Sequence, residues 1–519
     1  MMAIVFWTFS IVLAFRGLQC AKILTVCLIG GSHYLLLDEI SHNLQQHGHS
    51  VRMLLQLGTP RLTGFSYTGR QKSYQTSTWS LGEKYIREYN GWFLEQQTQF
   101  LLGRDDFSGF LTFMGHLSHQ CGRLLGDEKM MTFLQKEHYD VTVLDAFNPC
   151  SFILARKLGV RYIAFYPGAL NGPLSIGLPS PVSYVPVFNS QLTDHMDLWA
   201  RMKNLFYSLQ IPVAQAFVWS RFQDVADKHL EQAPSGLDEL HTGAELWAFN
   251  TDFSLEFPQP LMPFTVLVGG VLNKAAKPLQ QQDLESWISN LKEPCFIVVT
   301  LGSMVSSVSV ESLITELVAG FSSISQGVIW RYDTKQWPSH IEIPPNVKIV
   351  DWLPLNDLLG HPKACLFITH GGQNSLLQAV YHAVPVLGIP LFGDQFDNVV
   401  KAEAKGLGVA LKPTHITRDL LCSTIQTLIR DNRFKSSALS LSALHKSHPV
   451  PPAERFVLWV NHILQSGTGL HLKPVVLVQP WNERHQLEML LLLLVLLVFL
   501  TVCWSVCRKE NLNNKHKSQ

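Results

Sequence analysis

His370, Gly371 and Gly372 follow a predicted strand and could bind a charged ligand. The strand ends there, two glycines would let the backbone approach a ligand, and Asn374 and Ser375 begin a predicted helix. The first N–H groups of a helix have no partner within it, and the helix dipole adds positive potential, so such a turn can bind an anion. The side chains of His370, Asn374 and Ser375 would add hydrogen-bond donors. We therefore predict a diphosphate site at this turn.

Two further groups lie at strand ends on either side of the turn. Trp352 offers a flat face on which a base can stack, an interaction that contributes about 1–3 kcal/mol. Asp394 and Gln395 could accept from and donate to sugar hydroxyls. Each feature also has an ordinary explanation, since a lone Trp is often part of the core, His-Gly-Gly is often a tight turn and Asp-Gln often starts a helix. Their ordered combination favours adjoining sites for a base, a diphosphate and a sugar.

A candidate general base lies in the first half of the chain. His33 follows Gly30–Ser32, where a predicted strand turns into a helix, and Asp145 ends the apolar strand predicted at Val141–Leu144. An imidazole oriented by a carboxylate can remove a proton from a hydroxyl group near neutral pH. The alternative is that His33 only begins its helix, as histidines at helix starts often do.

Strands alternate with helices in both halves of the chain, which predicts an α/β protein with parallel sheets. In the first half we expect strands at Lys22–Ile29, Val51–Leu55, Val141–Leu144 and Arg161–Phe165, and helices at His33–Gln46 and Cys150–Leu158. In the second half we expect strands at Cys295–Leu301, Val328–Arg331, Val347–Val350, Leu366–Ile368 and Val386–Ile389. Ligands bind beyond the C-terminal ends of such strands, so two units face to face would form a cleft for two substrates.

Changes in composition divide the chain into segments. Residues 258–282 are rich in Pro, Gly and polar residues and are predicted to link a domain at 21–257 to a domain at 283–448. Residues 449–488 would form a return helix, expected at Glu454–Gln465, and a connection to a C-terminal apolar segment.

Both ends of the chain carry apolar segments. Residues 1–20 resemble a signal peptide, although Arg16 near the expected cleavage site leaves a signal anchor as an alternative. Residues 489–507 carry no charge and are long enough to cross a bilayer as a helix. The basic tail at 508–519 would then lie in the cytosol and the rest of the chain in the lumen. Lys515 and Lys517 resemble a dilysine signal, so we expect a type I single-pass protein of the endoplasmic reticulum membrane.

The composition argues against several classes of protein. Of the 519 residues, 47% are hydrophobic and 16% are charged, which is too apolar for a disordered chain. A net charge of +1 gives no basic field for nucleic acid. The nine cysteines include no CxxC pair, which argues against a zinc module or a thioredoxin-like centre, and a disulfide stays open. No GxGxxG with a later acidic residue follows a strand, which argues against a nicotinamide-dependent oxidoreductase.

The segment 352–395 resembles the signature of the UDP-glycosyltransferase superfamily, which contains the UDP-glucuronosyltransferases. Thr300–Val305 and Trp330-Arg331 also resemble family segments that contact the nucleotide. Leu192–Met196 and His471–Pro474 are most similar to animal UDP-glycosyltransferase family 3, with ceramide galactosyltransferase as a near relative. The similarity covers nearly the whole chain.

This resemblance implies a GT-B fold, in which two Rossmann-like domains face a cleft, and sugar transfer from a UDP-sugar with inversion at the anomeric carbon. The N-terminal domain would bind a small lipophilic or lipid acceptor, and the family's catalytic pair matches His33 and Asp145. No metal is expected to be required, because helix N–H groups can carry the diphosphate. A homo- or hetero-oligomer and the identity of the UDP-sugar stay open. The resemblance and the motifs together assign donor binding to Ser303, Arg331, Trp352, His370, Gly372, Asn374, Ser375, Gln378, Asp394 and Gln395.

Three residues depart from the family pattern. Leu355 stands where glutamine is usual, Gln378 where a glutamate normally binds the ribose hydroxyls, and Ala383 where glycine is usual. A hydrogen bond to a neutral group contributes less than one to a charged group, so Gln378 would weaken donor binding by on the order of 1 kcal/mol. Ala383 would cost about 1 kcal/mol if its φ is positive. These departures leave an alternative, a weakly active or inactive lumenal subunit that binds a UDP-sugar or a partner protein.

Overall fold

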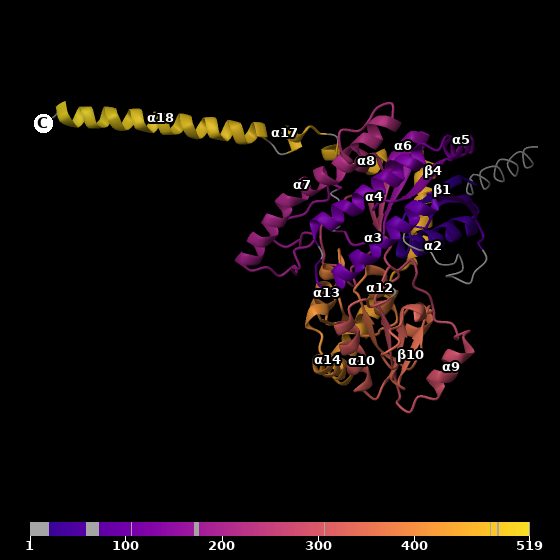
Figure 1. The fold of residues 1–519 in the computed structure, drawn as a ribbon. Coiled ribbons are helices and arrows are strands. Elements are labelled where there is room, and N and C mark those ends of the chain that lie inside the picture. Colours follow the sequence, from indigo (N-terminus) through magenta and orange to yellow (C-terminus); the bar gives the residue numbers. More distant parts are fainter. Residues whose placement is uncertain are drawn as a thin grey trace, which may run out of the picture. The chain divides into compact units, whose positions relative to one another are not determined.

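The computed structural model describes residues 20–58, 72–104, 106–170, 176–305, 307–477, 479–484 and 487–517. The chain forms two compact units, residues 1–471 and 472–519. The first unit contains two α/β halves, which Figure 1 shows in purple and orange. The predicted signal peptide lies outside the described residues, apart from Cys20.

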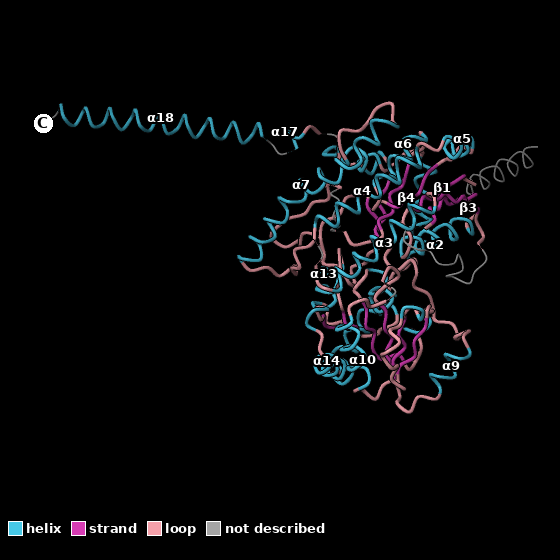
Figure 2. Tube along the Cα trace, viewed as in Figure 1, coloured by secondary structure: helices cyan, strands magenta, loops and turns pink. Residues whose placement is uncertain are grey.

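A parallel sheet forms the N-terminal half, and Figure 2 draws its strands in magenta. Its described strands lie in the order β3-β2-β1-β4-β5-β6-β7. The strands are β1 (Lys22–Cys27), β2 (Ser50–Leu57), β3 (Gln75–Ser80), β4 (Val141–Asp145), β5 (Tyr162–Tyr166), β6 (Leu246–Phe249) and β7 (Thr265–Leu267). The helices are α2 (Ser32–Gln46), α3 (Glu83–Leu101), α4 (Phe107–Leu125), α5 (Glu128–Lys136), α6 (Pro149–Leu158), α7 (Leu198–His229) and α8 (Leu237–Gly243). Because β1 and β4 are parallel neighbours, the segments that follow them leave the same edge of the sheet.

A second parallel sheet forms the C-terminal half, in the order β10-β9-β8-β11-β12-β13. Its strands are β8 (Phe296–Thr300), β9 (Gly327–Arg331), β10 (Val347–Val350), β11 (Ala364–Thr369), β12 (Val386–Gly388) and β13 (Gly408–Ala410). Its helices are α9 (Gln282–Ser289), α10 (Glu311–Ser322), α11 (Leu355–Leu359), α12 (Gln373–Tyr381), α13 (Gln395–Ala404), α14 (Arg418–Arg430) and α15 (Asn432–Lys446). Strand β8 is wholly buried, and apolar residues pack on both faces of the sheet.

The predicted linker at 258–282 differs from the structure. Thr265–Leu267 form β7 and pair with β6, so the N-terminal sheet continues into this range. The surrounding Pro and Gly residues indicated a loop because a strand this short leaves no clear periodic pattern. The return helix α16 (Pro452–Ser466) packs on α2, and the guanidinium of Arg455 donates to the carbonyl of Leu267 at 2.8 Å. The chain therefore returns to the N-terminal half after the C-terminal sheet.

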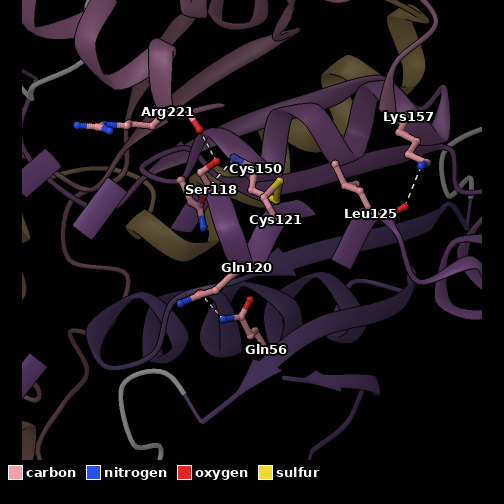
Figure 3. Close-up of a disulfide and its surroundings, with 9 residues drawn as sticks. Gln56, Ser118, Gln120, Cys121, Leu125, Cys150, Lys157 and Arg221 are labelled. Carbon is pink, nitrogen blue, oxygen red and sulfur yellow. Dashed lines mark hydrogen bonds between the residues drawn. A yellow bond between two sulfur atoms is a disulfide. The ribbon is translucent and has the colours of Figure 1, made fainter. Parts of the chain in front are cut away.

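Two disulfides occur in the described part of the chain. Cys121–Cys150 joins α4 to α6, and Cys295–Cys365 joins the start of β8 to β11. Figure 3 shows the first of these beside two side-chain hydrogen bonds of 2.6 Å and 2.9 Å, from Gln56 to Gln120 and from Lys157 to the carbonyl of Leu125. Helix α4 is thereby tied to β2 and α6.

The second unit contains α17 (Trp481–Arg484) and α18 (Leu487–Lys517). Residues Leu487–Val506 form a stretch of helix that is long and apolar enough to cross a membrane. No residue in its most apolar part is buried. This candidate span coincides with the segment predicted at 489–507. The helix also continues through most of the predicted tail at 508–519.

Candidate active site

The His33 imidazole and the Asp145 carboxylate form a hydrogen-bonded pair. Gly31 has φ 68 and α2 begins at Ser32, which puts His33 in the first turn of that helix. Asp145 ends β4, the neighbour of β1. Nδ1 of His33 lies 2.7 Å from Oδ2 of Asp145, and Oδ1 accepts a hydrogen bond from the Phe147 N–H at 3.0 Å. The two residues that the sequence singled out are thus in direct contact.

The surroundings of His33 favour a basic imidazole. The side chain of His33 is 16% exposed and that of Asp145 only 2%. Burial alone lowers the pKa of an imidazole, but the charge and hydrogen bond of Asp145, with the charge of Asp394, outweigh burial and raise the pKa of His33. Because an ionised carboxylate only accepts hydrogen bonds, the neutral imidazole carries its proton on Nδ1. Nε2 is therefore the atom that can take a proton from a substrate.

The C-terminal half lies against this pair. A Cβ atom at Gly31 would lie 2.8 Å from Oγ of Ser303, and one at Gly168 would lie 3.7 Å from Oδ2 of Asp394. Burial raises the pKa of Asp394, although a hydrogen bond from the Asn398 side chain opposes this effect. Two predicted donor residues therefore border the N-terminal half close to the candidate base.

His370 lies in a tight turn between β11 and α12. Gly371 has φ 82 and Gly302 has φ 92, backbone conformations that residues other than glycine adopt only with strain. A Cβ atom at Gly302 or at Gly372 would lie 2.5 Å from Nε2 of His370, so backbone encloses the imidazole. Burial, with a smaller contribution from the charge of Arg331, lowers the pKa of His370 to about 4. His370 is consequently neutral at pH 7 and can donate a hydrogen bond without adding a charge.

The elements around this turn suit an anionic nucleotide. Gly372 precedes α12 and no side chain caps the helix, so its first N–H groups can face an anion. Arg331 ends β9, and its guanidinium donates to the carbonyl of Gly302. The guanidinium carbon lies 5.7 Å from the centre of the Trp352 ring. The predicted aromatic face, a cation and the glycine turn are therefore contiguous.

Comparison with known proteins identifies the family. The family model described as UDP-glucoronosyl and UDP-glucosyl transferase matches residues 21–517. The chain belongs to this family. UDP-glucuronosyltransferase 3A1 of Bos taurus is 44% identical over 492 residues, which cover 95% of this chain and 93% of that protein. Human 2-hydroxyacylsphingosine 1-beta-galactosyltransferase is 33% identical over 88% of this chain and 82% of that protein.

Solved structures of glycosyltransferases share the fold of this UDP-glycosyltransferase. A UDP-glucosyltransferase from Polygonum tinctorium, solved with 3,4-dichloroaniline, aligns with a TM-score of 0.59 at 18% identity and covers 86% of this chain and 99% of its own. The glycosyltransferase SnogD from Streptomyces nogalater aligns with a TM-score of 0.57 at 16% identity and covers 86% and 100%. The predicted GT-B fold and the predicted UDP-dependent glycosyltransferase activity are confirmed.

Two of the residues predicted to bind the donor already have partners within the UDP-glycosyltransferase. Oδ1 of Asn374 accepts a hydrogen bond of 2.7 Å from the side chain of Asn250, which follows β6 in the N-terminal half. Oε1 of Gln395 accepts from the N–H groups of Leu391 and Phe392 at 2.9 Å and 3.2 Å. Asn374 thus joins the two halves, and Gln395 holds the turn before α13 in place.

The three departures from the family pattern lie at identifiable positions. Gln378 is buried on α12, as is Ser375, and Oε1 of Gln378 has no hydrogen-bond partner among the described residues. An unpaired buried polar group costs about 1–3 kcal/mol, which a ligand hydroxyl could recover. Ala383 has φ 56, so the cost expected for a left-handed alanine applies. Leu355 begins α11 and packs against the core of the C-terminal half.

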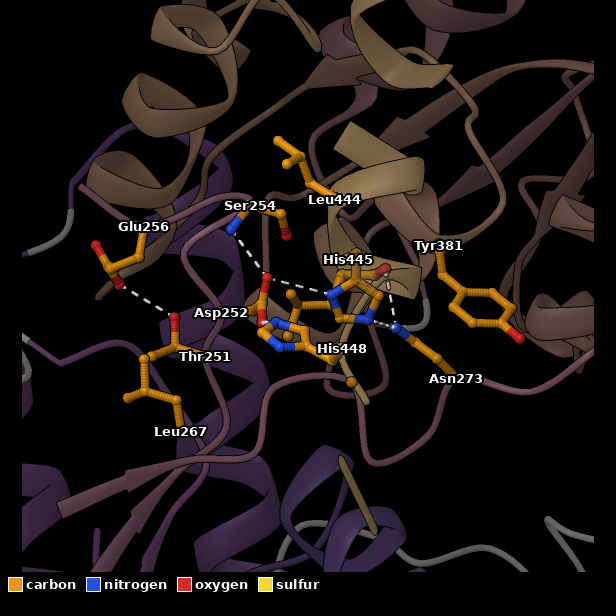
Figure 4. Close-up of polar contacts among 12 residues, drawn as sticks. Thr251, Asp252, Ser254, Glu256, Leu267, Asn273, Tyr381, Leu444, His445 and His448 are labelled. Carbon is orange, nitrogen blue, oxygen red and sulfur yellow. Dashed lines mark hydrogen bonds and ion pairs between the residues drawn. The ribbon is translucent and has the colours of Figure 1, made fainter. Parts of the chain in front are cut away.

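Sequence reasoning missed the residues that hold the two halves together. Figure 4 shows Asp252, which follows β6, beside His445 of α15 and His448. The carboxylate lies 3.3 Å from Nδ1 of His445 and 2.7 Å from Nε2 of His448. Burial would raise the pKa of Asp252, but hydrogen bonds from His445 and Ser254 hold it below its usual value. These contacts join distant segments, and no local sequence pattern marks them.

Proposed function

We propose that this UDP-glycosyltransferase transfers a sugar to a hydroxyl group of a small lipophilic acceptor, with inversion at the anomeric carbon and with His33 as general base. The 2.7 Å hydrogen bond between His33 and the buried Asp145 carries this proposal. It fixes the tautomer that leaves Nε2 free to accept a proton, and it stabilises the imidazolium that forms.

The reaction needs one proton transfer and one displacement. Nε2 of neutral His33 takes the proton of the acceptor hydroxyl while the acceptor oxygen bonds to the anomeric carbon. The bond from that carbon to the β-phosphate oxygen breaks, and its electron pair leaves with UDP. His370 and the N–H groups that begin α12 would receive the charge that develops on the diphosphate. Attack opposite UDP inverts the anomeric carbon.

The donor would extend across the C-terminal half from its base to its sugar. We assign the base to the face of Trp352, with Arg331 beside it, and the ribose to Gln378, whose side-chain oxygen lacks a partner in the described part of the chain. The diphosphate would lie at Gly372 and Ser375, and the sugar at Asp394, near His33. Ser303 would close the site from β8.

A series of aromatic rings supports a lipophilic acceptor. The ring of Phe147 lies 5.4 Å from that of His33, Phe113 lies 6.3 Å from Phe147, and Trp92 lies 6.4 Å from Phe113, measured between ring centres. These rings come from α3, α4 and the loop after β4. Apolar rings beside the base would exclude water and hold an aromatic or aliphatic acceptor.

We also propose that both halves lie in the lumen of the endoplasmic reticulum. The C-terminal candidate span and the basic residues after it support a type I orientation. Disulfides persist in oxidising compartments, and Cys121–Cys150 and Cys295–Cys365 fit that setting.

Transfer assays in microsomes test the proposed activity. Microsomes containing the full chain are incubated with radiolabelled UDP-glucose, UDP-N-acetylglucosamine, UDP-xylose, UDP-galactose or UDP-glucuronate and a panel of lipophilic alcohols and phenols. We expect transfer from at least one donor, and a loss of about 10²–10⁴-fold in His33→Gln. His340→Gln is the control, because His340 is an exposed imidazole paired with Glu311 at 3.0 Å. Full activity in His33→Gln would overturn the assignment of the base.

The second candidate is a weakly active subunit, which the left-handed Ala383 and the unpaired Gln378 favour. Its test is the triple variant Leu355→Gln, Gln378→Glu and Ala383→Gly, assayed beside the unmodified chain. Activity that arises only in the triple variant supports this candidate. Transfer by the unmodified chain at the rate of a related enzyme dismisses it.

A further inference from the structure

Residues 186–192, which we call the strap, belong to the N-terminal half in sequence but contact α13 of the C-terminal half. Asn189 has φ 64 and Gln191 has φ 52, so two residues other than glycine adopt a left-handed backbone conformation with one residue between them. That residue, Ser190, is fully buried. A strained backbone of this kind persists only where its surroundings hold it in place. The contacts of the strap should therefore account for its shape.

The carboxylate of Asp397 makes the contact that holds this shape. The N–H of Asn189 donates to Oδ2 of Asp397, and the N–H of Gln191 donates to Oδ1 at 2.8 Å. Backbone turns whose N–H groups converge form concavities that bind anions, and here the anion is a side chain in the first turn of α13. Both donors are main-chain groups. The attachment therefore depends on the side chain of Asp397 and not on the side chains of Asn189 and Gln191.

The other end of the strap is fixed to the N-terminal half. The buried side chain of Asn204 on α7 accepts a hydrogen bond from the N–H of Val187 at 2.8 Å. It also donates to the carbonyls of Val185 and Val182 at 2.8 Å and 2.9 Å. The strap is thus held at one end by α7 and at the other by α13, and it bridges the two halves.

The strap forms one wall of a pocket at the sugar end of the proposed donor site. Pro186, Val187, Phe188 and Leu192 line this pocket from the strap, and Asp394 and Asp397 line it from the start of α13. The side chain of Asn398 donates to Oδ2 of Asp394 at 2.8 Å, which fixes the carboxylate that we assign to the sugar. The start of α13 therefore holds both Asp394 and, through Asp397, the wall that the strap contributes.

We propose that Asp397 is a positioning residue for the sugar of the donor. Its carboxylate attaches the strap to α13, and the attached strap encloses the sugar beside Asp394. The described residues that line this pocket include none of those assigned to the base, the ribose or the diphosphate. Loss of the attachment should therefore weaken recognition of the sugar and leave recognition of UDP unchanged. This inference rests on the proposed function in one respect, the placement of the sugar at Asp394.

Calorimetric titration of the full chain in detergent separates recognition of the sugar from recognition of the nucleotide. The titrants are UDP and the five UDP-sugars named above. In Asp397→Asn an amide replaces the charged oxygens, and a hydrogen bond to a neutral group contributes less than one to a charged group. For the UDP-sugar that the unmodified chain binds most tightly, we expect Asp397→Asn to raise Kd at least about fivefold. The Kd of UDP should stay within about twofold.

Hydrogen exchange of residues 187–192 reports the attachment directly and needs no ligand. Exchange should be faster in Asp397→Asn than in the unmodified chain, because the N–H groups of Asn189 and Gln191 lose a charged acceptor. Gln191→Gly is the matched control on the strap. It keeps the N–H group and suits φ 52, so its binding of UDP-sugars should equal that of the unmodified chain.

Three results would overturn the proposal. Equal weakening of UDP and UDP-sugars in Asp397→Asn would indicate a general structural effect. Unchanged binding of UDP-sugars despite faster exchange would mean that the strap does not enclose the sugar, and unchanged exchange would mean that Asp397 does not hold the strap. Binding and exchange require neither an acceptor nor His33, so a failure of the proposed glycosyl transfer would leave these results interpretable.

Discussion

Replacing Asp145 with asparagine tests whether the contact with His33 serves catalysis. The amide oxygen of the new side chain could still accept from the Phe147 N–H, which Asp145 binds at 3.0 Å, so the local backbone should persist. The amide nitrogen would then face Nδ1 of His33, at the position of a 2.7 Å contact. To accept a hydrogen bond from this amide, Nδ1 of His33 must lose its proton. The proton then moves to Nε2, the atom that the proposed mechanism requires as the base. We therefore expect the loss of general base catalysis, about 10²–10⁴-fold in kcat, or roughly 3–5 kcal/mol.

The pH profile separates this mechanism from simple misfolding. Asp145 raises the pKa of His33, so kcat/KM of the unmodified enzyme should fall as the pH drops through that raised pKa. Without the carboxylate the pKa of His33 is lower, so the acid limb of Asp145→Asn should move to lower pH while its plateau also falls. Glu311→Gln serves as control, because it alters an exposed carboxylate–imidazole pair of 3.0 Å in the C-terminal half. An Asp145→Asn profile with an unshifted acid limb and an unchanged plateau would refute the reasoning.

Three further predictions concern stability. Ala383→Gly should raise the free energy of unfolding by about 0.5–1 kcal/mol, because it removes left-handed strain at φ 56, and a melting temperature no higher than that of the unmodified chain would contradict this. The pair Cys121→Ser and Cys150→Ser should lose about 3–4 kcal/mol, since the disulfide closes a sequence separation of 29, and thermal unfolding without reductant should show the loss. Burial, with a smaller contribution from Lys446, lowers the pKa of His382 from 6.5 to about 4, so the unfolded chain binds a proton between these pH values and the folded chain does not. Stability should fall as the pH drops from 6.5 towards 4, and this fall should be smaller in His382→Gln; equal falls in both proteins would argue against it.

The contact between His33 and Asp145 could be predicted because it depends on local signals and on sheet topology. β1 and β4 each end in residues that are recognisable from sequence, and parallel strands that become neighbours bring their C-terminal ends together. A helix was predicted at Cys150–Leu158, and α6 begins one residue earlier, at Pro149, after a cap at Asn148, and ends before Gly159, which has φ 67. Strand β10 matches the range expected for it.

Contacts between distant segments could not be predicted in this way. The bond from Asn250 to Asn374 depends on how one half docks on the other, and nothing near either residue encodes it. Gln395 was expected to bind a sugar, but its side-chain oxygen Oε1 accepts hydrogen bonds from two backbone N–H groups of its own turn. Hydrogen-bond donors and acceptors at a strand end can bind a ligand or stabilise a turn, and the sequence alone does not distinguish these two roles.

The return of α16 to the N-terminal half determines which half of the enzyme leads to the candidate span. The guanidinium of Arg455 donates to Leu267, that of Arg161 donates to Ile463 at 3.3 Å, and the N–H of Gly469 donates to Glu245. The polypeptide therefore continues to the candidate span from the half that carries His33, while the C-terminal half is connected to that half through chain crossings at both of its ends. Any hinge motion between the two halves would then move the C-terminal half alone and leave the N-terminal half joined to the segment that continues to the candidate span.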